Sequence, residues 1–364
     1  MIALNNKTSQ ELKSFYLLSS TAKISPIGSG HINDTYVIED FDRSFVVQRI
    51  NNNIFPEPEL LIKNFNTIAT LLERNKLSQQ YDYDVVRPVG NSQGDLYYID
   101  SQNNYWRAIT LVENSHSIQS VTDTRYAFEA AKAFASFTHA LSELQANDLN
   151  ITIANFHDLQ ARLDLFDTAL AAATEKAKEQ AANTIKFALD VGKKILAEFQ
   201  QLVARGLQLT IVHNDTKLNN ILFDNNQLKA RAVVDLDTVM AGYLLYDFGD
   251  MVRTMAMGCV EDDPLFSSYN INFDIVGSLA KGYGNVYSKS NLSQAELDSF
   301  KFAAKYMSFI IGLRFTTDFL NNNIYFKIQY DSHNLVRAQN QFYLTELLIA
   351  NQDKIDKIVE QSFN

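Results

Sequence analysis

The spacing of hydrophobic and polar residues divides the chain into two parts of different character. In the first part, short runs of β-branched and aromatic residues predict strands, at 24–27, 35–39, 45–50, 96–99 and 106–112. Helical spacing predicts a helix over 8–19, with Thr8 and Glu11 as a candidate capping box. A second helix is expected from Pro58 to about 75. This part is therefore mostly β, with one crossing helix.

After Glu113 the pattern becomes helical. Apolar residues recur at helical spacing in four segments, 123–145, 158–205, 293–320 and 333–361. The segment 208–242 interrupts them with short strands and polar loops. The pattern predicts an α+β fold with two lobes, a small β-rich lobe over 1–112 and a larger, mostly helical lobe over 113–364.

Composition and charge exclude several classes of protein. The chain of 364 residues is 46% hydrophobic and 20% charged, an ordinary balance for a globular protein. Its formal net charge of −10 disfavours nucleic acid as a partner, because phosphate backbones bind basic surfaces. A single cysteine excludes a disulfide within the chain. Polar residues throughout the first twenty positions do not fit a signal peptide, and no apolar run is long enough to span a membrane, so we expect a cytoplasmic protein.

The polar residues of the segment 208–242 have the spacing of a phosphotransfer site. Asn220 follows Asp215 by five positions, and Asp235 ends a short apolar run fifteen positions later. Phosphoryl transfer needs a carboxylate that orients or accepts the proton of the attacking hydroxyl, and nearby oxygen ligands for Mg²⁺. If the apolar runs pair as a hairpin, all three side chains meet at one end. The alternative is an ordinary solvated turn, which Asp and Asn also favour.

Two neighbouring features have weaker signals. Gly28 and Gly30 lie between predicted strands, where a glycine turn can cover phosphates, although many hairpins carry such glycines. Asp237 comes two positions after Asp235. It has three open roles: a contact to metal-bound water, a contact to the acceptor, or a loop cap.

Several blocks of sequence, collinear over roughly 25–340, resemble the N-acetylhexosamine 1-kinase branch of the aminoglycoside phosphotransferase and choline kinase family, whose members are relatives of protein kinases. These blocks are Gly28–Tyr36, Asn53–Pro56, His213–Leu222, Asp235–Met240, Tyr246–Asp250, Gly312–Phe315, Ile324–Phe326 and His333–Arg337. The catalytic-loop block alone is moderately specific, whereas the combination is specific for the branch.

The resemblance implies a two-lobed, protein-kinase-like fold. It also implies transfer of the ATP γ-phosphate to the anomeric hydroxyl of N-acetylglucosamine or N-acetylgalactosamine. Asp215 would be the base, and Asn220 and Asp235 would bind Mg²⁺. Gly28 and Gly30 would cover the phosphates. The residues that would contact the acceptor are His31, Asn33, Asp237, Arg314 and Tyr325.

Two further residues of the matching blocks are expected to be structural. His213 would hold the catalytic loop by hydrogen bonds. Asp247 begins a triplet that spells the metal-binding Asp-Phe-Gly of protein kinases, yet it lies 27 positions beyond Asn220. We therefore expect Asp247 to be a helix cap or loop anchor, and we assign the metal to Asp235.

The strand at 45–50 departs from the kinase pattern. Kinases have a phosphate-binding lysine there, whereas this chain has Gln48 and Arg49. Because successive strand residues face opposite sides, only one of the two can point at ATP. The departure leaves a nucleotide-binding pseudokinase open as an alternative, alongside an aminoglycoside or choline-type phosphotransferase. The sequence does not give the sugar epimer or the oligomeric state.

Overall fold

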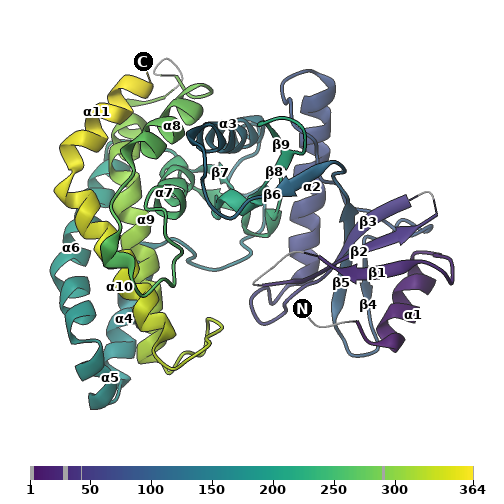
Figure 1. The fold of residues 1–364 in the computed structure, drawn as a ribbon, viewed down its shortest axis with the longest axis horizontal. Helices are drawn as coiled ribbons and strands as arrows, with labels where there is room; N and C mark the ends of the chain where they lie inside the picture. Colours follow the sequence, from purple (N-terminus) through teal and green to yellow (C-terminus); the bar gives the residue numbers. More distant parts are fainter. Residues whose placement is uncertain (1–3, 28–31, 42, 289–291, 364) are drawn as a thin grey trace.

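The computed structural model describes residues 4–27, 32–41, 43–288 and 292–363. The chain forms a small lobe with a five-stranded sheet and a larger helical lobe, and the long helix α2 lies between them (Figure 1). The sheet is antiparallel, with strand order β1-β2-β3-β5-β4. Its strands are β1 (Lys23–Pro26), β2 (Asp34–Asp40), β3 (Arg43–Arg49), β4 (Tyr97–Ile99) and β5 (Tyr105–Thr110).

One face of this sheet packs against the first helix, α1 (Asn6–Phe15). The residues buried between them include Leu12 of α1 and the strand residues Tyr36, Val47, Trp106 and Ala108. Because buried residues alternate along each strand, the other face of the sheet is left for the large lobe. The predicted capping box is wrong, because Asn5 caps the helix by accepting a hydrogen bond from the Thr8 backbone N–H at 2.8 Å. Thr8 lies inside the helix and is buried.

Helix α2 (Pro58–Leu77) joins the two lobes. Its apolar residues from Phe65 onward belong to the main core of the large lobe. Two buried amides fix it there, since Asn64 donates to the Asn150 carbonyl at 2.8 Å and Asn75 donates to the Ala140 carbonyl at 2.7 Å. The predicted boundary between residues 112 and 113 falls between β5 of the small lobe and β6 (Ser115–Ser117), which pairs in the large lobe.

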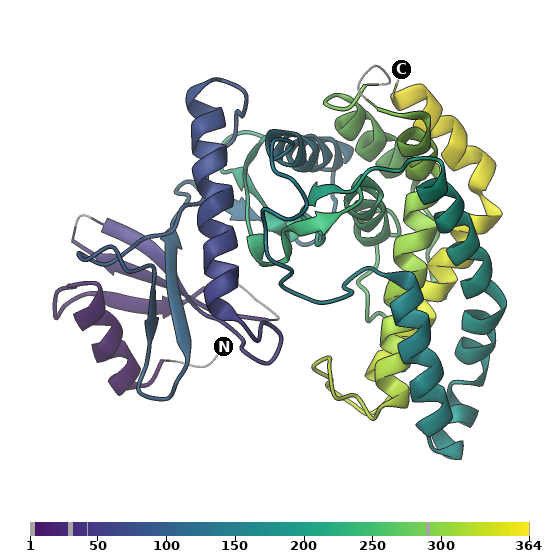
Figure 2. The same ribbon diagram turned by 180° about the vertical axis from the view of Figure 1, so that it is seen from behind.

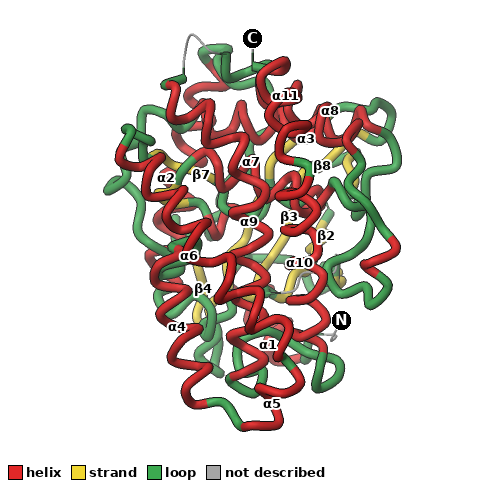
Figure 3. Tube along the Cα trace, turned by 90° about the vertical axis from the view of Figure 1, so that its left-hand side faces the viewer, coloured by secondary structure: helices red, strands yellow, loops and turns green. Residues whose placement is uncertain are grey.

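The large lobe is a layered set of helices (Figures 2 and 3). They are α3 (Thr124–Ala140), α4 (Leu159–Ala172), α5 (Glu175–Gln180), α6 (Ala182–Ala204), α7 (Leu244–Met255), α8 (Phe273–Gly284), α9 (Gln294–Leu320), α10 (His333–Ala350) and α11 (Gln352–Ser362). Helix α9 is buried along most of its length because α4, α6, α7 and α10 surround it.

Two of the predicted helical segments are interrupted. The segment 158–205 breaks near Ala173, where the Thr174 hydroxyl caps the start of α5 by accepting a hydrogen bond from the Ala177 N–H. The segment 333–361 breaks at Asn351, between α10 and α11. At each break one helix ends and the next begins, and the chain changes direction. The apolar spacing continues on both sides of the break.

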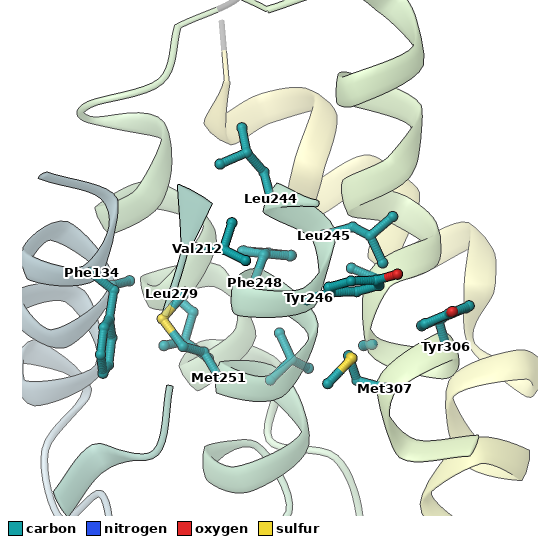
Figure 4. Close-up of a cluster of buried hydrophobic side chains, with 14 of the residues drawn as sticks. Phe134, Val212, Leu244, Leu245, Tyr246, Phe248, Met251, Leu279, Tyr306 and Met307 are labelled. Carbon is teal, nitrogen blue, oxygen red and sulfur yellow. The ribbon is translucent and has the colours of Figure 1, made fainter. Parts of the chain in front are cut away.

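Helix α7 brings the core up to the loop 213–220, which resembles the catalytic loop of kinases and is given that name here. Tyr246, Phe248 and Met251 pack with side chains from α9 and β7, as Figure 4 shows. Gly249 permits this approach, because a Cβ at this position would lie 2.3 Å from the Ala303 carbonyl oxygen of α9. The close packing of α7 on α9 fixes the residues at the start of α7, which support the site described next.

Short strands carry the polar segment between α6 and α7. The strand β7 (Thr210–Val212) pairs with β10 (Met240–Gly242). The strands β8 (Ile221–Asp224) and β9 (Ala230–Val233) form a hairpin that β6 extends. Asn220 precedes β8 and Asp235 follows β9, and the Val234 N–H donates to the Asn220 carbonyl at 2.9 Å. The predicted hairpin is therefore confirmed, and it brings the two residues to one end.

Candidate active site

The loop between β7 and β8 is held by His213. This side chain is fully buried against the rings of Phe134 and Phe137. Its Nε2 lies 3.0 Å from the Val234 carbonyl, and its Nδ1 accepts a 3.3 Å hydrogen bond from the Asp215 N–H. Burial lowers the pKa of His213. A neutral imidazole with both nitrogens engaged is a support for the loop and has no free atom for a base.

Asp247 anchors the same loop from the first turn of α7. Its carboxylate accepts hydrogen bonds from the backbone N–H groups of His213 at 2.9 Å and Asn214 at 2.8 Å. Thr138 donates a third bond at 3.3 Å. Burial raises the pKa of Asp247 to about 7. Because both carboxylate oxygens are used by the loop, Asp247 has the geometry of an anchor, as the spacing predicted.

Asp215 lies at the centre of the loop beside a lysine. Its Oδ1 is 3.0 Å from the Lys217 Nζ, and its Oδ2 accepts a 3.1 Å hydrogen bond from the Asn220 amide. Burial raises the pKa of the Asp215 carboxyl, but the nearby positive groups, Lys217 first and Arg253 among the others, together outweigh burial, so this pKa lies below its ordinary value. Asp215 is therefore an ionised carboxylate at neutral pH, with a cation next to it.

Asp235 follows β9 in a left-handed backbone conformation, with φ of 61°. Asp235 is exposed, and desolvation by the surrounding protein together with the nearby carboxylates of Asp237 and Asp215 raises its pKa to about 7. Neither the Asp235 carboxylate nor the Asn220 Oδ1 makes a hydrogen bond to another residue of the described ranges. Two free oxygen donors in a region of crowded negative charge fit a divalent cation.

Asp237 joins the two lobes. The Asn33 amide donates to its Oδ2 at 2.7 Å, and the Arg107 NH1 lies 2.6 Å from its Oδ1. Asn33 is also used by the small lobe, because its Oδ1 accepts a 3.0 Å hydrogen bond from the Asn51 N–H. Both predicted acceptor residues, Asn33 and Asp237, are thus buried and bonded to each other. Gly28, Gly30 and His31 lie outside the described residues.

Gln48 and Arg49 lie on opposite faces of the sheet. Gln48 pairs in register with Arg107, whose guanidinium donates to the Gln48 Oε1 at 3.0 and 2.7 Å. Arg49 pairs in register with Trp106, on the α1 side, and forms an exposed ion pair with Asp34. The face of the sheet directed at Asp237 therefore carries Gln48 and Arg107.

Arg314 and Tyr325 form a second group. The Arg314 guanidinium lies over three rings, 4.8 Å from the Phe156 centroid, 5.5 Å from Phe326 and 5.9 Å from Tyr325. It is 9% exposed and forms no ion pair with a carboxylate of the described residues. Burial lowers its pKa. The Tyr325 hydroxyl takes one contact of this guanidinium, and because a guanidinium has five donors, further N–H groups are available to a ligand oxygen.

The loop of Tyr325 is positioned by Asp318. This buried carboxylate accepts hydrogen bonds from the backbone N–H groups of Tyr325 at 2.8 Å and Phe326 at 2.9 Å. The Asn334 amide donates to it at 2.9 Å. The bonds fix two of the three rings around Arg314.

His157 connects the Arg314 group to the catalytic loop. Its ring packs 4.2 Å from Phe156, and its Nε2 is 2.9 Å from the Asn214 carbonyl. Burial, followed by the nearby Arg314 charge, lowers the pKa of His157 to about 3. This neutral ring therefore spans from the residues around Arg314 to the residue before Asp215.

The His157 shift predicts a pH dependence of stability. The folded pKa of about 3 lies below the ordinary value of 6.5, so the unfolded chain binds a proton that the folded chain does not as pH falls below 6.5. Between pH 6 and 5, His157 should therefore lower the free energy of unfolding by up to about 1.4 kcal/mol per pH unit. Urea unfolding of the wild type and of His157→Gln, which keeps a donor to Asn214, measures this slope. Parallel curves for the two proteins would contradict it.

An ionic network borders the catalytic loop on the α7 side. Arg253 donates to the Asp250 Oδ1 at 2.8 Å, is paired with Glu261, and contacts Gln341 at 3.3 Å. The Asp250 Oδ2 is buried and makes no hydrogen bond within the described ranges. The Asp215 carboxylate raises the pKa of Lys217 against the lowering effect of burial, and Glu261 and Asp250 raise it further. Cations and carboxylates thus alternate on this side of Asp215.

The arrangement agrees with a comparison to known families. A model described as the phosphotransferase enzyme family matches residues 23–280, more than half of the chain. The chain belongs to this family. The coarse prediction from the sequence, a small-molecule phosphotransferase of the aminoglycoside phosphotransferase and choline kinase type, is thereby confirmed.

Solved structures share the fold of this phosphotransferase. An aminoglycoside phosphotransferase from Alicyclobacillus acidocaldarius has a TM-score of 0.66 at 13% identity, over 99% of this chain and 98% of that one. The amicoumacin kinase hAmiN, in complex with AMP-PNP, Ca²⁺ and Ami, has 0.62 at 12%, over 93% and 92%. A choline kinase from Cryptosporidium parvum has 0.58 at 14%, over 97% and 94%. The predicted two-lobed, protein-kinase-like fold is confirmed.

Sequence reasoning about this phosphotransferase missed three residues of the site. Lys217 was within a matching block, and its position two residues after Asp215 was a signal that could have been used. Arg107 gave no local signal, because its partner Asp237 lies far along the chain. Arg253 lies close in the sequence to both of its partners, Asp250 and Glu261, so its spacing from them could have been used. No helix of the described residues is long and apolar enough to cross a membrane.

Proposed function

We propose that this phosphotransferase transfers the γ-phosphate of ATP to the anomeric hydroxyl of an N-acetylhexosamine, N-acetylglucosamine or N-acetylgalactosamine, to give the sugar 1-phosphate. The observation that carries the proposal is the Asp215 carboxylate, kept ionised by Lys217 and connected through Asn214 and His157 to the group around Arg314. One end of this chain of contacts suits a base, and the other suits a hydroxylated acceptor.

In the proposed reaction the oxygen of the acceptor hydroxyl bonds to the γ-phosphorus, and Asp215 accepts the proton of that hydroxyl. The bond from the γ-phosphorus to the bridging oxygen breaks, and ADP leaves with that electron pair. Lys217, with its ammonium 3.0 Å from Asp215, can neutralise charge on the transferred group. Positioning and electrostatics supply the catalysis in such a direct in-line transfer, and no phosphoenzyme is needed.

Asn220 and Asp235 fit a magnesium ion. Within the described part of the chain no group of three or more histidine, cysteine or acidic side chains is arranged as metal ligands. Mg²⁺ commonly takes one or two protein carboxylates together with phosphate oxygens and water. Asn220 Oδ1 and Asp235 would hold it, and the bound ion would offset the negative charge of the phosphates.

The charges on the acceptor side favour a neutral acceptor. A choline-type or aminoglycoside acceptor is cationic and would meet the Arg314 guanidinium, which has no carboxylate partner among the described residues, while the acidic residues Asp250 and Glu261 are already paired with Arg253. A sugar instead offers hydroxyl and acetamide oxygens to Arg314 and an apolar face to the aromatic rings. This reasoning supports the sugar-kinase assignment over the two family alternatives.

Arg314→Ala should raise the KM for the sugar, because acceptor oxygens would lose their donors. Leaving a buried polar group unpaired costs about 1–3 kcal/mol, which corresponds to a rise of roughly 5- to 150-fold. The KM for ATP should stay nearly unchanged. Steady-state kinetics with each substrate varied in turn measure both constants.

Arg74→Ala is the matched control for this variant. Arg74 is an exposed arginine on α2, paired with Glu143, so its removal should change neither constant. If Arg314→Ala disturbs ATP and sugar equally, Arg314 does not belong to the acceptor site.

A panel of acceptors tests the proposed function. ADP release is followed with N-acetylglucosamine, N-acetylgalactosamine, an aminoglycoside and choline under the same conditions. The proposal predicts turnover with at least one N-acetylhexosamine and none with the two cationic acceptors. Turnover with only a cationic acceptor would replace the sugar by that class. Nucleotide binding without ADP release from any acceptor would favour the pseudokinase alternative.

A further inference from the structure

A polar row crosses the sheet of the small lobe on the face directed at the large lobe. Thr35, Gln48 and Arg107 are direct register partners on β2, β3 and β5. Thr35 accepts a 3.3 Å hydrogen bond from the Gln48 amide, and Gln48 in turn accepts two bonds from Arg107. The row therefore ends in a guanidinium whose orientation is set by its neighbour.

The Arg107 guanidinium is buried but incompletely bonded. It is 3% exposed and lies 5.2 Å from the centroid of Phe65 on α2. Its NH1 is 2.6 Å from the Asp237 Oδ1, yet the two groups are not aligned as a hydrogen bond, and neither atom makes another within the described residues. A buried guanidinium nitrogen with no aligned acceptor has N–H groups available to a further oxygen.

Asp237 ties this cation to the loop of Asp235. Only Leu236 separates the two acidic residues. The ring of Phe65 on α2 packs against the Arg107 guanidinium, and the carboxylate beside the guanidinium is that of Asp237 in the large lobe. The cation of the small lobe and the carboxylate predicted to bind metal are therefore held in one arrangement, at the place where the lobes meet.

We propose that Arg107 binds the phosphate oxygens of the nucleotide, in the role that a lysine of the neighbouring strand has in kinases, and that Gln48 and Asp237 position its guanidinium. The inference rests on the proposed use of ATP. Gln48 has the strand position of the lysine but no charge, and Arg49 faces the other side of the sheet. Arg107 supplies the missing positive charge from one strand away.

The test compares adenosine with ADP, because only ADP carries phosphates. Isothermal titration calorimetry gives both dissociation constants, and their ratio measures the phosphate contribution within each variant. The double variant Arg107→Gln/Asp237→Asn removes the cation without leaving a buried unpaired carboxylate. We expect its ratio to fall about 10- to 150-fold, the range for losing a hydrogen bond to a charged group, with adenosine affinity unchanged.

Two further variants keep the test decisive if the double variant does not fold. Gln48→Glu is nearly isosteric and places a negative charge against the guanidinium, so it should also lower the ratio. Asp237→Asn alone keeps the cation and should lower the ratio less than the double variant does. The matched control, Arg74→Gln/Glu143→Gln, removes an exposed ion pair and should leave the ratio at the wild-type value.

An unchanged ratio in Gln48→Glu, or in the double variant, would overturn the role of Arg107 while leaving nucleotide use intact. An equal loss of adenosine and ADP affinity would also overturn it, because the effect would then be general damage to the site. A fall in Asp237→Asn as large as that in the double variant would assign the effect to the loop and not to Arg107. If the wild type does not prefer ADP to adenosine, the proposed function fails and this inference fails with it.

Discussion

Asp215→Asn is expected to lower kcat by roughly 10²–10⁴, the range for losing a general base. The substitution keeps the shape of the side chain and the hydrogen bond from Asn220, but it removes the charge that attracts the proton of the acceptor hydroxyl. It also leaves Lys217 without the carboxylate 3.0 Å from its ammonium. Nucleotide affinity should change little, because the proposed phosphate contacts come from other residues.

The measurement is steady-state kinetics at saturating ATP and acceptor. Asp224→Asn is a matched control, since Asp224 lies at the other end of β8, where it bonds to Arg231. Its kcat should remain close to that of the wild type. If Asp215→Asn retains activity within a factor of about three, far outside the range for a lost base, Asp215 is not the base.

Asp235→Asn should raise the Mg²⁺ concentration needed for half-maximal activity and lower kcat as well. Loss of an outer-shell partner of a metal costs about 10- to 100-fold in affinity or activity, and loss of a direct ligand should cost at least as much. Asp247→Asn should leave the Mg²⁺ requirement nearly unchanged, because the Asp247 oxygens accept hydrogen bonds from the backbone of the catalytic loop. Its effect should fall on stability instead.

A Mg²⁺ titration of the two variants side by side separates these roles. Thermal unfolding of both proteins provides the second readout, since only the loss of the loop anchor should lower the melting temperature by several degrees. A larger shift in Mg²⁺ requirement for Asp247→Asn than for Asp235→Asn would move the metal to Asp247.

The parts of the site that the sequence predicts are those built from short stretches of chain. The β8–β9 hairpin follows from two apolar runs, and it places Asn220 near Asp235 whatever the rest of the fold does. The distinction between Asp235 and Asp247 also depends on local spacing. The supporting role of His213 was implied by the resemblance, and its two ring nitrogens do meet backbone groups of Val234 and Asp215.

The parts that could not be predicted join distant segments. Asp237 meets Asn33, which lies 204 positions away in the sequence, and Arg107, which lies on β5 of the small lobe. The partner of Gln48 is set by strand register, which hydrophobic spacing alone did not give for β3 and β5. The cap of α1 was missed for a different reason: Asn5 and Thr8 are both acceptable cap residues, and only the start of the helix decides between them.

The position of the transferred phosphate tests the central claim most directly. The wild-type protein is incubated with ATP, Mg²⁺ and an N-acetylhexosamine, and the product is examined for coupling between phosphorus and the sugar protons by nuclear magnetic resonance. The account predicts coupling to the anomeric proton, which identifies the sugar 1-phosphate. Coupling to the protons at carbon 6, or no sugar phosphate at all, would contradict it.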